Sequence, residues 1–173
     1  IIGDPKDIAS ARALAASDKF QFEWWALSLV DARPAQDKKK GADRGVDGYI
    51  YFFDDESGQA KKVVVQVKGG HVNAAQVRDL KGTVEREKAV IGVFITLEEP
   101  TGPMRAEAAS AGFYEFRHVI SGSDLKFPRI QIFTVEELLN GAMVRMPAHA
   151  IEDTIRRAER RTKEAPDSQL PLL

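Results

Sequence analysis

Three polar residues of this chain could together hydrolyse a phosphodiester bond: Asp47, Gln66 and Lys68. A carboxylate and a side-chain carbonyl are hard oxygen ligands, the type that Mg²⁺ takes in proteins. A bound Mg²⁺ neutralises a phosphate oxygen and lowers the pKa of a bound water, and an ammonium group beside it stabilises developing negative charge. If the fold brings the three side chains together, they predict a metal-dependent hydrolytic site. Taken singly, each has an ordinary structural explanation, such as a turn aspartate or a lysine at a strand end.

The pattern of apolar residues places these side chains at the open end of a β-hairpin. Residues 46–53 and 61–68 are rich in β-branched and aromatic residues and are separated by a turn, which predicts two antiparallel strands. On the second strand, Gln66 and Lys68 point to the same face, about 6.5 to 7 Å apart. The first strand begins opposite the end of the second, so we expect Asp47 and Lys68 to lie close together.

The segments after the hairpin predict a parallel crossover. Residues 73–89 have the apolar spacing of a helix with Asn73 as its N-cap, and residues 91–96 form a continuous apolar strand. A strand, a helix and a second strand form a β-α-β unit with parallel strands and a right-handed crossover, so the sheet is expected to be mixed. Lys68 then ends a parallel strand, where ligands bind in open α/β sheets.

The remaining pattern predicts an α/β fold with a mixed β-sheet of about four to five strands flanked by helices. The domain is expected to span residues 1–145, with a charged C-terminal helix and tail over 146–173. The other predicted elements are helices at 4–16 (with Asp4 as N-cap), 18–31, 102–111, 135–140 and 149–164, a loop at 32–45 and a strand at 129–133.

The predicted helix 18–31 is apolar on nearly all sides and is expected to be substantially buried. We interpret Trp24 and Trp25 as core residues rather than as base-stacking residues. Glu23 stands out in this helix, because an unpaired buried carboxylate is costly. It is therefore expected to face a cleft, to pair with a cation, or to lie at the helix edge.

The order of these motifs resembles the PD-(D/E)xK nuclease superfamily, and in particular its Mrr-like restriction endonuclease branch, where glutamine often replaces the middle acid. More narrowly, the chain resembles the nuclease-like region that follows the catalytic domain of some bacterial site-specific DNA methyltransferases. The resemblance covers roughly residues 3–140. It rests on FQFEWWALSL (20–29), KKGADRGVDG (39–48), the strand 63–70, VRDLKGTVEREK (77–88) and the segment 91–114.

The resemblance implies a restriction-endonuclease-like core, a DNA substrate and Mg²⁺, or Mn²⁺, as cofactor. It implies that Asp47 is the principal metal ligand, that Gln66 holds the position of the second acid and that Lys68 is the catalytic lysine. Glu23 becomes a helix-borne carboxylate that faces the site and contributes to the metal. Gln66 lacks the negative charge of the usual acid, so metal binding and cleavage are expected to be weakened unless Glu23 compensates.

Local basic clusters are the candidates for contacts with the phosphates of double-stranded DNA, although the net charge of −1 gives no overall basic footprint. These candidates are Lys38, Lys39, Lys40, Lys61, Lys62, His71, Arg78 and Lys81.

Composition excludes several other classes. The chain has no cysteine, so it has no disulfide framework and no thiol nucleophile. Its sequence has no apolar stretch long enough for a membrane span and no secretory signal, so a cytoplasmic protein is expected, without a membrane partner. Because it begins at Ile1, we expect a piece of a longer protein, with a fused or associated DNA methyltransferase as one candidate neighbour. Whether two copies pair to cut both strands, as a homodimer would, is left open.

Three hypotheses follow for the function. The first is a Mg²⁺-dependent DNA endonuclease domain in a bacterial restriction-modification context. The second is a nuclease-fold module that binds DNA after its site has decayed, and Gln66 is the residue that supports it. The third is an α/β interaction domain without a nucleic-acid role, which the near-neutral charge supports.

Overall fold

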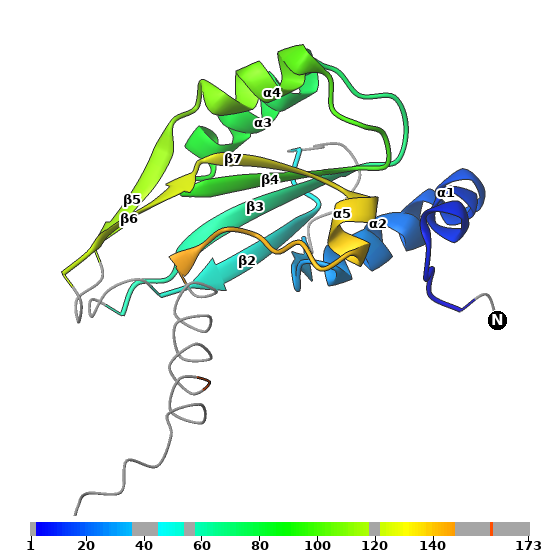
Figure 1. Cartoon of the computed structure of the whole chain (residues 1–173), viewed down its shortest axis with the longest axis horizontal. Helices are drawn as coiled ribbons and strands as arrows, with labels where there is room; N and C mark the ends of the chain where they lie inside the picture. Colours follow the sequence, from blue (N-terminus) through cyan, green and yellow to red (C-terminus); the bar gives the residue numbers. More distant parts are fainter. Residues whose placement is uncertain (1–2, 36–44, 54–57, 118–121, 148–159, 161–173) are drawn as a thin grey trace, which may run out of the picture.

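The computed structural model describes residues 3–35, 45–53, 58–117, 122–147 and 160. Two layers of helices enclose a central sheet (Figure 1). The helices are α1 (Ile8–Ser17), α2 (Lys19–Ser28), α3 (Ala74–Arg86), α4 (Gly102–Ala109) and α5 (Val135–Leu139). The strands are β1 (Arg33–Pro34), β2 (Gly48–Phe52), β3 (Lys61–Lys68), β4 (Ile91–Thr96), β5 (Phe113–Arg117), β6 (Asp124–Pro128) and β7 (Ile130–Thr134).

The main sheet has five strands in the order β1-β2-β3-β4-β7. β2 and β3 pair antiparallel, whereas β3 pairs parallel with β4 and β4 pairs parallel with β7. The prediction of a mixed α/β sheet, with a parallel pair joined by a crossover helix, is therefore confirmed. Lys68 pairs with Thr96, so the two central parallel strands end side by side.

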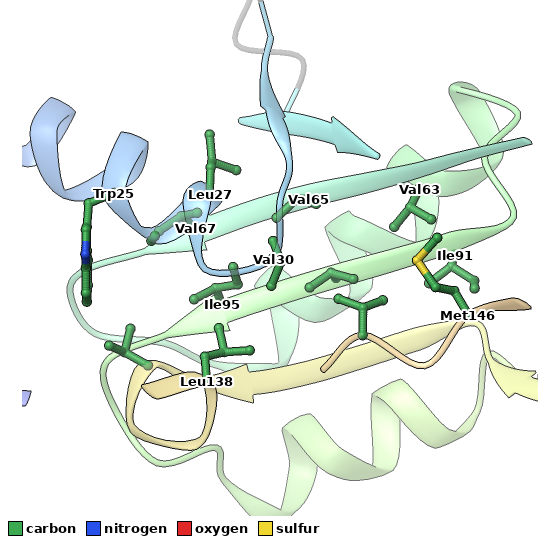
Figure 2. Packing of buried hydrophobic residues seen from close by; sticks show 14 of the residues in the cluster. Trp25, Leu27, Val30, Val63, Val65, Val67, Ile91, Ile95, Leu138 and Met146 are labelled. Atoms are coloured by element: carbon green, nitrogen blue, oxygen red, sulfur yellow. The ribbon is translucent and has the colours of Figure 1, made fainter. Parts of the chain in front are cut away.

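Each face of the sheet is covered by its own apolar cluster. Val63, Val65 and Val67 of β3 pack with residues of α1, α2 and α5 on one face, as Figure 2 shows around Trp25, Leu27 and Leu138. Val64 packs on the opposite face, beneath α3 and α4. This alternation agrees with the predicted facing of the strand. All six residues of β4 are buried because both faces of that strand are covered.

Side-chain caps explain where the helices begin. The predicted cap Asn73 of α3 is confirmed, and α2, for which the sequence offers Ser17 or Asp18, is capped by Asp18; each cap accepts a hydrogen bond from a backbone N–H of the first turn. The first helix was predicted to start three residues too early, with Asp4 as its cap. Asp7 caps it instead, accepting from the N–H of Ser10 at 2.8 Å in a reciprocal capping box.

The pattern predicted no element between the helix 102–111 and the strand 129–133, yet β5 and β6 form an antiparallel ribbon that projects from the main sheet (Figure 1). Phe116 and Phe127 anchor the ribbon in the core, and Tyr114 meets Phe52 edge to face at 6.4 Å. Tertiary packing of isolated aromatic residues therefore decides this ribbon.

The prediction that Trp24 belongs to the core is wrong. Trp25 is buried, but Trp24 has an exposed fraction of 61% and Phe20 one of 64%. The reason is that α2 rests on the sheet through one side only, so part of its apolar surface faces solvent. The predicted helix 149–164 lies outside the described residues, apart from Arg160. Within the described ranges, none of the helices combines the length and the apolar character that crossing a membrane requires.

Candidate functional site

The segment Gly45–Gly48 leads into β2, and steric constraints explain why both of its ends are glycine. Gly45 has φ +68°, in the left-handed region that favours glycine. A Cβ on Gly48 would lie 2.7 Å from Cδ2 of Leu27 and 2.8 Å from the backbone oxygen of Arg33. Only glycine therefore lets α2 and β1 pack this closely on the start of β2.

Asp47 lies at a local irregularity of the hairpin. Its N–H donates to the carbonyl oxygen of Val65 at 2.9 Å, although the register partner of Val65 is Gly48. Two consecutive residues thus oppose a single residue of β3, which is the arrangement of a β-bulge. A bulge re-aims side chains, and here Oδ2 of Asp47 accepts a hydrogen bond from the N–H of Val67 at 2.8 Å. The carboxylate of Asp47 is therefore held against β3, between the positions of Gln66 and Lys68.

Gln66 is buried, with an exposed fraction of 7%. Among the residues that the structure describes, its Oε1 is the buried side-chain oxygen that lacks a hydrogen-bond partner. The segment before Asp47 lies close to it, since a Cβ on Gly45 would be 3.5 Å from Nε2 of Gln66 and 3.3 Å from Oγ1 of Thr83. A buried carbonyl without a donor is costly, which marks this position as unusual.

Thr83 is a site neighbour that the sequence analysis missed. It is buried on α3, donates to the carbonyl of Asp79 at 3.0 Å and accepts from Arg86 at 3.1 Å. The available signal was its place within the apolar stripe of the helix, three residues after Leu80.

Lys68 is half-buried and ends β3 beside Thr96, as predicted. The exposed His71 follows in the next loop, and its Nδ1 lies 3.4 Å from Oε2 of Glu98. Glu98 also donates its N–H to Oγ1 of Thr96 at 3.1 Å. An acidic residue that the sequence analysis did not single out therefore lies at the ends of the parallel strands, next to the histidine expected to meet phosphate.

Glu23 is buried in α2, and Oε1 lies 3.9 Å from the ammonium group of Lys19. It is one helical turn before Leu27, whose methyl groups pack at Gly48. Glu23 therefore lies on the side of α2 that faces the sheet near the start of β2. Its contribution to the site stays a prediction.

Asp47→Ala is expected to lower the free energy of unfolding by about 1–3 kcal/mol, because it leaves the N–H of Val67 buried without an acceptor. Asp47→Asn keeps an oxygen at that position and is expected to recover most of the loss. Chemical denaturation of both variants measures this difference. Equal losses in the two variants would contradict a structural role for this hydrogen bond.

The predicted phosphate-binding residues do not form one free patch. Arg78 and Lys81 of α3 both bind Glu107 of α4, at 3.2 and 3.0 Å. Lys62 lies 3.3 Å from Oε2 of Glu87. Lys38, Lys39 and Lys40 lie outside the described residues. Contact of these cations with DNA stays a prediction.

The salt bridges from Arg78 and Lys81 of α3 to Glu107 of α4 are expected to weaken in acid. The hydrogen bond from Lys81, together with the charge of Arg78, lowers the pKa of Glu107 below its ordinary value of 4.5. A lowered pKa stabilises the fold above the ordinary value, and this contribution is lost as the pH falls through the folded-state pKa. We expect Glu107→Gln to lower the unfolding midpoint at pH 7 and to have almost no effect near pH 3. Glu85→Gln, which removes an exposed carboxylate from α3, is the control, and a pH-independent loss at Glu107 would contradict the assignment.

The oxygen donors are few for a metal site. Within the described residues, no cluster of three or more His, Cys, Asp or Glu is placed to hold a metal ion. Asp47 brings one negative charge and already binds an amide with Oδ2, whereas Gln66 brings a neutral oxygen. Mg²⁺ is strongly hydrated and gains little from so few charges. This donor set does not fit a tightly held divalent ion.

Comparison with known proteins finds a solved structure and a family model that are similar to this chain. The restriction endonuclease FokI has a solved structure that is similar with a TM-score of 0.44 and 18% identity, covering 78% of this chain and 26% of the FokI chain. The chain therefore spans about a quarter of that protein. No curated protein matches. Residues 20–140, more than half of the chain, match the family described as NACHT-associated inactive Restriction Endonuclease 1. The predicted restriction-endonuclease-like core is thus confirmed, and the chain belongs to the NACHT-associated inactive Restriction Endonuclease 1 family.

Proposed function

We propose that this domain binds double-stranded DNA through its restriction-endonuclease-like fold without hydrolysing it. The observation that carries the proposal is Gln66, a buried neutral amide at the position where the nuclease resemblance implies an acid, and its Oε1 has no hydrogen-bond partner among the described residues. DNA cleavage, the first of the three hypotheses from the sequence, becomes the alternative to this proposal.

The charge of the oxygen donors supports the loss of metal binding. Asp47 and Gln66 together bring a single negative charge, whereas the nuclease resemblance implies two acids at these positions to attract Mg²⁺ or Mn²⁺. Asp47 serves the hairpin instead, by accepting the N–H of Val67. DNA binding is therefore expected to be the same with Mg²⁺ and with chelator.

The family description supports the same view, because it calls this restriction endonuclease inactive. It also names a NACHT association, so we propose a NACHT domain as the neighbour in the full-length protein, in place of the methyltransferase suggested by the sequence resemblance. The Mrr-like assignment and the homodimer stay predictions.

Electrostatic contact with phosphates is the expected source of affinity, since a neutral domain can still carry local cations. Lys68 is the cation at the end of the central parallel strands, and Lys61 is half-buried at the start of β3. Each contact of this type that is lost reduces the salt slope of binding by about one.

Duplex binding measured by fluorescence anisotropy at several salt concentrations, with Mg²⁺ or with chelator, tests the proposal. We expect steep salt dependence, no effect of the metal, and a shallower slope in Lys68→Ala. Lys126→Ala, a cation of the projecting ribbon that pairs with Glu115 at 3.3 Å, is the matched control.

A supercoiled plasmid incubated with Mg²⁺ or Mn²⁺ completes the test. Nicking that disappears in Asp47→Asn and in Lys68→Ala would overturn the proposal in favour of an active nuclease. Asn is preferred to Ala at position 47 because it preserves the structural hydrogen bond while it removes the charge. Failure to bind duplex DNA at low salt would support an interaction domain instead.

A further inference from the structure

His71 and Glu98 meet where the two central parallel strands end. Nδ1 of His71 is 3.4 Å from Oε2 of Glu98, and both side chains reach solvent, with exposed fractions of 83% and 45%. His71 follows β3 in the chain and Glu98 follows β4, so the pairing of these two strands brings the side chains together. The pair is negative while His71 is neutral and has no net charge once His71 is protonated.

The pair lies within electrostatic reach of Lys68, the cation proposed to contact DNA phosphate. Lys68 ends β3 opposite Thr96, and the backbone N–H of Glu98 donates to Oγ1 of Thr96 at 3.1 Å. Two glycines alone separate Lys68 from His71 in the chain, so their Cα atoms are at most about 11 Å apart. This separation is comparable to the Debye length of about 10 Å at about 0.1 M salt, so a phosphate bound by Lys68 senses the charge of the pair.

The other charged groups around this edge come from every element that packs there. Arg12 of α1 donates its Nη2 to a backbone carbonyl of the segment after β4 at 3.4 Å. In the same segment Glu99 binds Arg105 of α4 at 2.7 Å. Glu23 of α2 lies 3.9 Å from the ammonium group of Lys19, and the first turns of α3 and α4 contain no acidic residue.

Histidine is the side-chain type whose charge ordinarily changes between about pH 5 and 8. His71 is the only histidine within the described ranges, since His118 and His149 lie outside them. The charge of this edge is therefore expected to respond to pH in the physiological range through His71.

We propose that the pair of His71 and Glu98 regulates DNA binding, so that the affinity for DNA rises as the pH falls from about 8 to about 6. While His71 is neutral, the carboxylate of Glu98 opposes a phosphate at Lys68. Protonated His71 neutralises this carboxylate and provides an additional charged N–H donor for the phosphate. This inference rests on the proposed function, since it assigns the regulation of the site that Lys68 forms.

Duplex binding measured by fluorescence anisotropy at about pH 6 and about pH 8, in buffers of equal ionic strength, tests the proposal. One additional phosphate contact corresponds to roughly five- to tenfold in affinity at about 0.1 M salt, so the wild-type protein is expected to bind that much more tightly at the lower pH. His71→Gln is expected to bind weakly at both pH values. His71→Lys, which is charged throughout this range, is expected to bind tightly at both. A pH effect that is equally large in His71→Gln would overturn the proposal.

The two other histidines of the chain provide the matched controls, because His118→Gln and His149→Gln are expected to keep the full pH effect. Loss of the effect in either variant, with His71 intact, would count against His71. Glu98→Gln removes one negative charge at both pH values, so it is expected to raise the affinity at both while the difference between them remains. An unchanged affinity in Glu98→Gln would show that this carboxylate does not oppose phosphate and would overturn the role given to the pair.

Proton uptake gives a direct readout of the same event. Isothermal titration calorimetry of DNA binding at about pH 7, in two buffers with different ionisation enthalpies, measures the protons taken up on binding. We expect uptake by the wild-type protein and none by His71→Gln or His71→Lys. Uptake that persists in both variants would show that another group titrates. Circular dichroism at each pH verifies that the variants are folded, as expected for a side chain that is 83% exposed.

The remaining outcomes separate the two proposals. If the wild-type protein binds duplex DNA with the same affinity at both pH values, the regulation by His71 fails and the proposed function stands. If the protein binds DNA at neither pH, both proposals fail.

Discussion

Gln66→Glu is expected to destabilise the domain by roughly 3 kcal/mol at neutral pH, because it places a carboxylate in a buried position where the described part of the chain offers no hydrogen-bond donor to Oε1. The same change adds a second carboxylate to that of Asp47, so Mg²⁺ or Mn²⁺ should restore stability in the variant. Each tenfold excess of metal over its dissociation constant returns about 1.4 kcal/mol. Thermal unfolding with metal and with chelator measures both effects.

Gln131 provides the matched control, since it is also a buried glutamine. Its amide is fully used: Nε2 donates to the carbonyls of Pro128 and Arg145 at 3.0 and 2.7 Å, and Oε1 accepts the N–H of Arg145 at 2.8 Å. Gln131→Glu should therefore destabilise the fold without any response to metal. A metal response in the wild-type protein as large as in Gln66→Glu would contradict the view that Gln66 is what prevents metal binding.

Gly48→Ala is the second change with a large expected effect, with a loss of about 2–3 kcal/mol and of about 5–10 °C in the melting temperature. The added methyl group would meet Leu27 at 2.7 Å and the backbone oxygen of Arg33 at 2.8 Å. A side chain can move away from such a contact, but the backbone of β1 is held by its pairing with β2. Differential scanning calorimetry checks the prediction.

Gly70→Ala is the control for Gly48→Ala, because a Cβ at Gly70 would meet no atom within 4 Å. Its melting temperature is expected to stay within about 2 °C of the wild-type value. If Gly48→Ala and Gly70→Ala have the same melting temperature, the close approach of α2 and β1 to Gly48 does not contribute to stability.

The motif Gly-Val-Asp-Gly (45–48) contributes to the structure independently of any chemistry. Gly48 is needed for the close packing of α2 and β1, and Asp47 accepts a structural hydrogen bond from Val67. Neither role requires catalysis. A nuclease-like motif can therefore persist in a family described as inactive, because the hairpin depends on the same residues.

The sequence by itself determined the helices and strands that depend on interactions between residues close together in the chain. The alternation of Val63 to Lys68 predicted the two faces of β3, and Asn73 predicted the start of α3, because strand period and helix capping act over a few residues. The spacing of strand, helix and strand also predicted the parallel pairing of β3 with β4.

Only the tertiary structure decided how the site residues are used. The bulge that turns Asp47 toward the N–H of Val67, the burial of Gln66 and the exposure of Trp24 all depend on segments distant in sequence. The physical reason is that burial and hydrogen-bond satisfaction are set by what packs against a residue, and a pattern of neighbours along the chain does not contain that information.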